Sequence, residues 1–177
     1  SIQMLEEMHN TKWENTVVWN KMYLKELFND IRFPKGKIHE DEFTTYKILY
    51  KINKIAIINK YLYNYRQNEE SITGKKFNIR RLDILEAIEV RTSFFQKQHE
   101  EELYDLSLEF YLQKIRECYI NVKKYISEPQ KIENELVEKH KRYSNYVLKS
   151  KRIKIKSKLK ILIFWISPQL FYKLKEH

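Results

Sequence analysis

The chain has 177 residues, of which 34 are Lys or Arg, 24 are Asp or Glu, one is Cys and two are Gly. With Gly36 and Gly74 as the only glycines, the glycine-rich phosphate loops and the G-x-S-x-G nucleophile turn are excluded. A single Cys118 and five scattered His argue against a disulfide framework and a structural zinc site, so no metal site is predicted.

The net charge of +10 is concentrated at the C-terminal end. Residues 139–177 contain 12 Lys or Arg and one acid, Glu176, which gives +11, whereas residues 1–138 contain 22 basic and 23 acidic residues, which gives −1. A terminal basic block beside apolar residues suits an anionic membrane surface, and basic faces also bind nucleic acid. Charge alone leaves both partners open.

The N-terminal part, residues 1–75, has a mixed pattern. Apolar residues have helix-like spacing from Trp13 to Phe28, before a turn at residues 33–36. A second, short helix is predicted from Glu42 to about Lys51.

Two short strands are predicted next, at residues 55–58 and 61–65, because both runs are rich in β-branched and aromatic residues. Tyr61, Tyr63 and Tyr65 alternate within the second run. We expect such a row to pack a sheet against a helix, and the alternative is a surface that stacks sugars. The N-terminal part is therefore predicted to be a small partial α/β region.

From residue 78 onward, apolar residues recur at three and four positions, which predicts three antiparallel helices. The first is marked by Leu82 to Phe95, the second by Leu108 to Ile126, and Pro129 opens the third. Pro168 starts or kinks a final short helix. The chain is predicted to be mainly α, divided into residues 1–75, a helical extension at 76–150 and a basic amphipathic tail at 151–177.

Three consecutive acids, Glu40, Asp41 and Glu42, follow a turn and precede a predicted helix. One interpretation is a helix cap, since acids at a helix start satisfy free N–H groups and the helix dipole. The other is a general base, an Asp oxygen directed into a cleft with a neighbouring acid that orients a polar ligand. The acids by themselves leave both interpretations open.

The wider sequence around these acids resembles the acceptor-side half of family 2 (GT-A fold) bacterial glycosyltransferases of capsule, exopolysaccharide and wall-glycan synthesis. Five elements carry the resemblance, in the same order as in that family: Asn20-Lys21-Met22-Tyr23, the F-P-x-G turn, Glu40-Asp41, the Y-x-Y-R element at 63–66, and Ser71-Ile72. The segments RLDILEAIEVRTSFF and KLKILIFWISPQLFYKL also resemble the helical C-terminal extensions of such enzymes.

The resemblance implies roles for four residues. Asp41 takes the position of the base that deprotonates the acceptor hydroxyl in an inverting transfer, and Glu40 is expected to contact the acceptor or donor sugar. Arg66 and Ser71 match the residues that close over the diphosphate, where a guanidinium and a hydroxyl stabilise the leaving phosphates. For Arg66 the alternative is an exposed charge at a strand end.

The chain departs from the family in one respect, because it has no Asp-x-Asp to hold a metal on the nucleotide. We therefore expect a C-terminal fragment that carries the base and the acceptor wall, and that is inactive without the missing N-terminal nucleotide-sugar half. No cofactor is expected in this fragment, whereas Mg²⁺ or Mn²⁺ with a nucleotide-sugar is implied for the longer parent. The expected acceptor is a glycan or a lipid-linked glycan, and uncovered apolar surface predicts a homo-oligomer.

The tail is predicted to contact an anionic membrane surface. Lysines alternate with apolar residues before a strongly apolar run, and the predicted membrane contacts are Lys154, Lys156, Lys158, Lys160, Phe164 and Trp165. The alternative is that the aromatics pack on the helical bundle while the lysines stay solvated. The tail predicts a cytoplasmic protein, peripheral to the inner face of the membrane, and no motif supports nucleic-acid binding.

A second class of function also fits the sequence. It is a non-enzymatic basic helical module that binds a membrane surface or nucleic acid, in which the acidic residues are only a cap.

Overall fold

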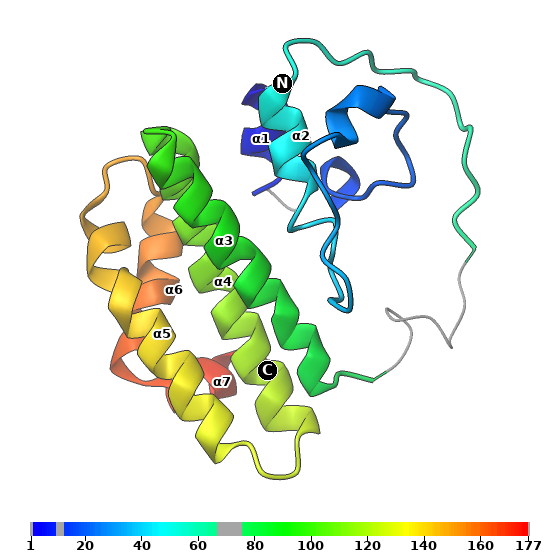
Figure 1. The fold of residues 1–177 in the computed structure, drawn as a ribbon. Helices are drawn as coiled ribbons and strands as arrows, with labels where there is room; N and C mark the ends of the chain where they lie inside the picture. The colour runs from blue at the N-terminus through cyan, green and yellow to red at the C-terminus, as the bar shows by residue number, and fades with distance from the viewer. Residues whose placement is uncertain (1, 10–12, 67–75, 177) are drawn as a thin grey trace.

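The computed structural model describes residues 2–9, 13–66 and 76–176, and it confirms a mainly α fold (Figure 1). Within these ranges there are seven α-helices and no strand. Their bounds are α1 Ile2–Glu7, α2 Thr45–Lys51, α3 Asp83–Lys97, α4 Glu101–Tyr125, α5 Gln130–Lys149, α6 Ile155–Ile166 and α7 Pro168–Glu176.

The three predicted antiparallel helices are α3, α4 and α5, and α4 packs against both of the others. His99 adopts a left-handed backbone angle (φ 58°) that ends α3, and Pro129 stands directly before α5. The buried face of α4 is built from residues spaced by three and four, including Leu108, Leu112 and Ile115. This periodicity is the reason that the bundle could be predicted from the sequence.

Helices α6 and α7 close the bundle and bury one face each. Ile161 and Phe164 from α6, together with Phe171 from α7, belong to the same hydrophobic core as α3, α4 and α5. The final short helix predicted at Pro168 is confirmed. Among the described residues, no helix is both long enough and apolar enough to cross a bilayer.

The N-terminal helices α1 and α2 pack against the end of α3 and the start of α4. A second hydrophobic core forms there from Leu5, Met8, Tyr46, Leu49, Phe95 and Leu103. The short predicted helix at 42–51 is confirmed in part, because α2 begins at Thr45.

The prediction of a helix between Trp13 and Phe28 is wrong. This segment contains only two single-turn 3-10 helices, η1 Trp13–Asn15 and η2 Lys25–Phe28. The Lys21 ammonium donates to the carbonyl oxygens of Glu14 and Val17, both at 2.6 Å. A side chain therefore satisfies backbone groups that a helix would have satisfied.

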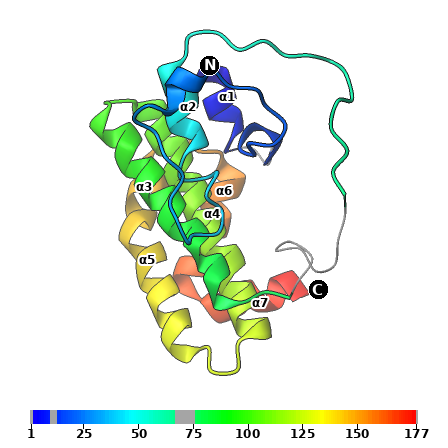
Figure 2. The same ribbon diagram turned by 45° about the vertical axis from the view of Figure 1, so that its right-hand side comes forward.

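The two predicted strands are also absent, because residues 55–58 and 61–65 form an exposed, irregular loop that extends away from the helices (Figure 2). A strand needs a partner for its backbone hydrogen bonds. No neighbouring strand exists in the described part of the chain, so the β-rich composition has nothing to pair with.

Candidate functional site

The candidate site is a tight turn formed by residues 39–42 before α2. His39 has a left-handed φ of 60°, and the Glu42 amide donates to its carbonyl oxygen at 3.1 Å. The carbonyl oxygen of Asp41 then accepts from the amides of Thr44 and Thr45 at 3.0 and 2.8 Å. The main chain therefore fixes the position of Asp41.

The three consecutive acids have three different environments. Glu40 is exposed, Asp41 is half-buried, and Glu42 is largely buried in an ion pair with Arg91, with 2.6 Å between Nη1 and Oε2. The N-cap residue of α2 is Thr44, and no side chain makes a capping hydrogen bond there. This geometry disfavours the helix-cap interpretation of the acids.

Arg91 anchors the turn to the bundle and was missed by the sequence reasoning. Its side chain is fully buried in α3, with the guanidinium carbon 5.3 Å from the centre of the Phe110 ring. The sequence held a signal, because Arg91 stands among the apolar positions Ile84, Ile88 and Phe95 on one face of its helix. A charge at a core position needs a buried partner, and Glu42 is that partner.

The carboxylate of Asp41 binds a proton more readily than the carboxylate of an exposed Asp. Burial, with a smaller contribution from the charge of Glu40, raises the pKa of Asp41. The Glu42 amide donates to Oδ1 of Asp41 at 2.8 Å and opposes this rise. Oδ2 takes no part in that hydrogen bond.

Two residues of the N-K-M-Y element, Lys21 and Tyr23, interact electrostatically with Asp41. Burial lowers the pKa of Lys21 to about 8, and the nearby charges of Asp41 and Glu14 oppose this shift. Burial and then the charge of Asp41 raise the pKa of Tyr23 to about 12. Two of the five elements behind the resemblance therefore meet at one place in the fold.

The F-P-x-G turn is fixed to α3 beside the acids. Gly36 has a φ of +82°, a conformation that favours glycine. The Asp83 carboxylate accepts from the Ile38 amide at 3.1 Å and lies 3.5 Å from the Lys37 ammonium, which also pairs with Glu86. This turn and the Glu42–Arg91 pair hold the loop of residues 33–42 on the bundle.

An aromatic stack joins the N-terminal segment to the irregular loop. The ring of Trp19 is stacked on Tyr63 and Tyr65, with centroids 4.5 and 4.9 Å apart. The prediction that the Tyr row packs into a core is wrong, because Tyr61, Tyr63 and Tyr65 are all exposed. Tyr63 and Tyr65 instead stack on Trp19, and the rest of their surface is open to water.

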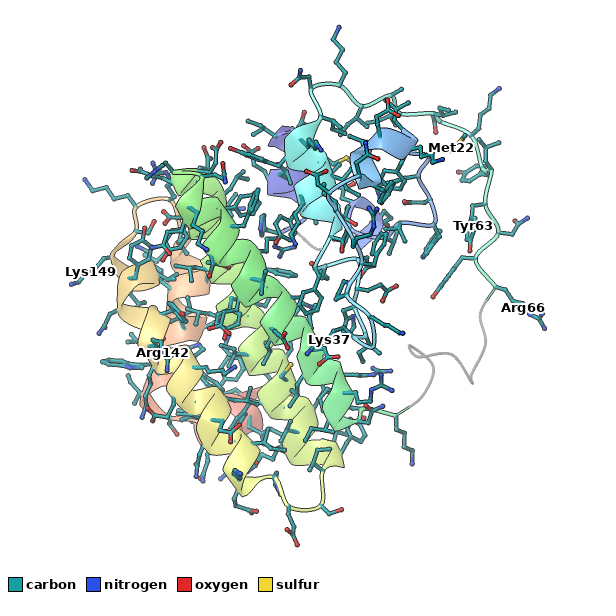
Figure 3. All side chains as sticks on the ribbon, in the orientation of Figure 1. Met22, Lys37, Tyr63, Arg66, Arg142 and Lys149 are labelled. Atoms are coloured by element: carbon teal, nitrogen blue, oxygen red, sulfur yellow. The ribbon has the colours of Figure 1, made fainter. Side chains whose placement is uncertain are left out.

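The two predicted diphosphate residues do not join the Asp41 turn in the described structure. Arg66 is exposed and points away from the molecule at the end of the irregular loop (Figure 3). Ser71 lies outside the described residues.

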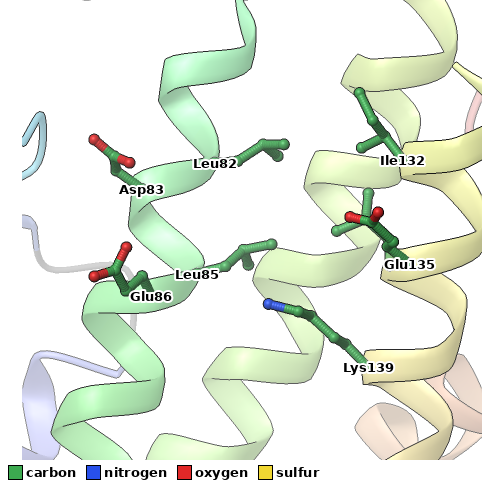
Figure 4. Close-up of a pocket in the computed structure, with 8 residues that line it drawn as sticks. Leu82, Asp83, Leu85, Glu86, Ile132, Glu135 and Lys139 are labelled. Carbon is green, nitrogen blue, oxygen red and sulfur yellow. The ribbon is translucent and has the colours of Figure 1, made fainter. Parts of the chain in front are cut away.

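A cavity of about 260 Å³ lies between α3 and α5, and Asp41 is not among the residues that line it. Leu82 and Leu85 face Ile132 across it, and Glu135 and Lys139 line its α5 side (Figure 4). Four apolar and four charged side chains line this groove, and none of them belongs to the five ordered elements that carry the resemblance to the acceptor-side half. Among the described residues, no cluster of three metal-ligating side chains is present.

The predicted membrane contacts in the tail divide into two groups. Phe164 is fully buried, with ring centroids 5.1 Å from Tyr119 and 5.4 Å from Phe171, so it cannot face a membrane in this structure. Phe164 lies on the buried side of α6, so the prediction that this residue contacts a membrane is wrong. Trp165 is exposed, as are Lys154, Lys156 and Lys160, and Lys158 is half-buried.

Part of this chain is similar to glycosyltransferases. A stretch of 59 residues is 37% identical to Glycosyltransferase GlyG of Streptococcus pneumoniae serotype 4, and 55 residues are 36% identical to Glycosyltransferase GlyA of the same organism. These matches cover 33% and 31% of this chain, but only 20% and 8% of the two relatives. The chain therefore spans a fifth or less of the length of these relatives. No family model and no solved structure matches the chain.

Proposed function

We propose that this chain is the acceptor-side and C-terminal helical part of an inverting, nucleotide-sugar-dependent glycosyltransferase of the family 2 (GT-A) type. The enzyme would act in capsule, exopolysaccharide or cell-wall glycan synthesis. The observation that carries the proposal is the Asp41 turn, in which the main chain fixes a half-buried carboxylate whose pKa is raised. Partial similarity to two glycosyltransferases supports it.

In this mechanism Asp41 is the general base. An oxygen of its carboxylate takes the proton of an acceptor hydroxyl as the hydroxyl oxygen forms a bond to the anomeric carbon of the donor. The bond from that carbon to the diphosphate breaks at the same time, and the nucleoside diphosphate leaves with the electron pair. A base acts best when its pKa approaches the working pH, and burial moves Asp41 in that direction.

Neighbouring residues have supporting roles. Lys21 stabilises negative charge on Asp41 before proton transfer, because the Asp41 charge and the Lys21 ammonium interact favourably. Tyr23 and exposed Glu40 are placed to bind acceptor hydroxyls. The pair formed by Glu42 and Arg91 positions the turn and does not touch the substrate.

The donor chemistry is assigned to a part that this sequence does not contain. Nucleotide, diphosphate and Mg²⁺ or Mn²⁺ would bind a separate nucleotide-sugar half, since this chain has no Asp-x-Asp. We propose that Arg66 and Ser71 reach the diphosphate only when that half is present.

The test uses the longer glycosyltransferase that contains this sequence. Release of nucleoside diphosphate is measured with a panel of nucleotide-sugars and glycan acceptors, for the wild type and for Asp41→Asn. We expect a loss of about 10²-fold or more in kcat, with donor affinity unchanged, because only proton removal is lost. The acid limb of the kcat/KM profile should disappear in the variant, since activity falls as Asp41 is protonated.

Two controls accompany this variant. Glu40→Gln should raise KM for the acceptor more than it lowers kcat, because an exposed acid binds substrate without accepting the proton. Glu117→Gln, which changes a half-buried acid on α4, should leave both constants unchanged. Wild-type turnover by Asp41→Asn would remove Asp41 from the mechanism, and micromolar binding of a nucleotide-sugar by residues 1–177 alone would contradict the division into halves.

A further inference from the structure

Helix α6 exposes a continuous apolar stripe along its outer side. The stripe consists of Ile155, Leu159, Leu162 and Ile166, whose exposed fractions are 83, 58, 37 and 70%. Their spacing of four, three and four residues places all of them on one face, opposite the buried Ile161 and Phe164. We call these four residues the α6 stripe. Burying such a face in an apolar environment is favourable, and the described chain leaves it in water.

Four lysines flank the α6 stripe. At 3.6 residues per turn, Lys156 and Lys160 lie along one side of it and Lys158 lies along the other, while Lys154 is the N-cap residue directly before the helix. No Asp or Glu occurs in residues 139–175, and no salt bridge to any of these four lysines is found in the described part of the chain. Their charges are therefore available to an external anion.

The neighbouring Arg152 makes a useful contrast. It lies 3.4 Å from Asp105 and 3.5 Å from Glu101, so its charge is already balanced by acids of α4. The lysines of α6 project beyond the reach of these acids. The unbalanced charge thus coincides with the unburied apolar face.

We propose that the α6 stripe docks on an anionic lipid bilayer, with the helix lying parallel to the membrane surface. The apolar side chains would enter the boundary between headgroups and acyl chains, while the lysine stems extend outward so that the ammonium groups meet lipid phosphates. Trp165, exposed near the end of the helix, adds an amphipathic ring suited to that boundary. This proposal is independent of the proposed catalytic function.

Charge selects this occupant over two others. A second copy of the chain docked through the same face would bring two sets of four lysines together without a balancing acid in the helix. Nucleic acid would satisfy the lysines but would leave the α6 stripe without an apolar partner. An anionic bilayer supplies both negative charge and an apolar interior.

The test is flotation of the 177-residue chain with vesicles of phosphatidylcholine, with and without phosphatidylglycerol. We expect binding that requires phosphatidylglycerol and that weakens with added salt. Lys156→Gln/Lys158→Gln should lower the partition coefficient about 30-fold, from about 1 kcal/mol for each Lys at 1.4 kcal/mol per tenfold. Leu159→Gln/Leu162→Gln keeps the charge, removes apolar burial and should lower it about tenfold or more.

Matched controls use positions elsewhere on the bundle. Lys139→Gln/Lys141→Gln removes the same charge from α5, and Val90→Gln removes an exposed apolar side chain from α3. Both should bind vesicles within about twofold of the wild type. Circular dichroism checks that each variant keeps its helix content, which surface substitutions should not alter.

Fluorescence quenching by brominated lipid chains tests the depth of insertion. Quenching should be seen in the wild type and should be reduced in Trp165→Phe, because Trp165 is the tryptophan nearest the lipid. Equal binding to neutral vesicles, or no difference between the α6 variants and their controls, would overturn the proposal. Self-association abolished by Leu159→Gln/Leu162→Gln, without vesicle binding, would assign this face to a second copy and would equally overturn it.

Discussion

Arg91 on α3 donates a 2.6 Å hydrogen bond to Glu42, the residue directly after Asp41. The Arg91 side chain is fully buried and Glu42 is largely buried, so the two charges depend on each other in a region with little water. Burial raises the pKa of Glu42, and the charge of Arg91 opposes that rise. This contact joins the candidate site to the helical bundle.

The first prediction concerns the stability of this pair. Glu42→Gln should lower the free energy of unfolding by about 3–5 kcal/mol, because it leaves the buried Arg91 charge without its counterion. Urea unfolding followed by circular dichroism measures the change. Glu117→Gln removes a partner of the more exposed Lys114 and should cost no more than about 1 kcal/mol. Similar small losses in both variants would show that the buried pair does not anchor the turn.

The second prediction concerns pH. Burial, with the nearby charge of Arg116, lowers the pKa of His140 to about 3 from an ordinary value near 6.5. Between these values the unfolded chain holds a proton that the folded chain does not, so stability falls as pH falls below about 6.5. His140 alone should cost about 2 kcal/mol by about pH 5, at about 1.4 kcal/mol per pH unit.

Urea unfolding near neutral pH and near pH 5 tests this expectation. His140→Gln should lose about 2 kcal/mol of the pH dependence, whereas His99→Asn, which changes an exposed residue, should retain it. An unchanged dependence in His140→Gln would mean that other groups, such as the buried His9, account for the acid sensitivity.

The third prediction separates packing from membrane contact in α6. Phe164→Ala should destabilise the chain by about 3–5 kcal/mol, because a fully buried ring that contacts Tyr119 and Phe171 is removed. Leu159→Ala, on the exposed side of the same helix, should stay within about 0.5 kcal/mol of the wild type. Thermal unfolding compares the two, and a mild effect of Phe164→Ala would place this ring outside the core.

The fourth prediction concerns the loop of residues 53–66. Trp19→Ala removes the ring that stacks on Tyr63 and Tyr65, and aromatic pairs contribute about 0.5–1.5 kcal/mol each beyond burial. Hydrogen exchange in this loop should become faster, while exchange in α4 should be unchanged. Trp165→Ala serves as the control, because it removes a tryptophan without touching the loop. Unaltered exchange in Trp19→Ala would show that the stack does not order these residues.

The fifth prediction concerns the F-P-x-G turn. A Cβ added at Gly36 meets nothing within 4 Å, so Gly36→Ala introduces backbone strain without a clash. With φ at +82°, we expect a loss of about 1–2 kcal/mol. Gly36→Asn should lose less, because Asn tolerates left-handed angles better. Equal stability of the Ala variant and the wild type in urea unfolding would show that the turn relaxes freely.

The sequence determined the helical part of this protein. Apolar residues at spacings of three and four, the lack of glycine after Gly74, and Pro129 and Pro168 specify α3, α4, α5 and α7 closely. These signals are local, because a helix satisfies its hydrogen bonds within one segment. They also placed the three acids before a short helix.

The tertiary structure alone decided what the local signals could not. Strand-like composition at residues 55–65 gave no strand, because a strand requires hydrogen bonds from a distant segment. The three adjacent acids are equivalent in the sequence. In the structure Glu42 pairs with Arg91, Glu40 is exposed, and Asp41 is half-buried between them. The buried Phe164 and the exposed α6 stripe alternate along one apolar run, and packing against α4, α5 and α7 determined which side met the core. Burial depends on which surfaces meet in three dimensions, and local spacing carries only part of that information.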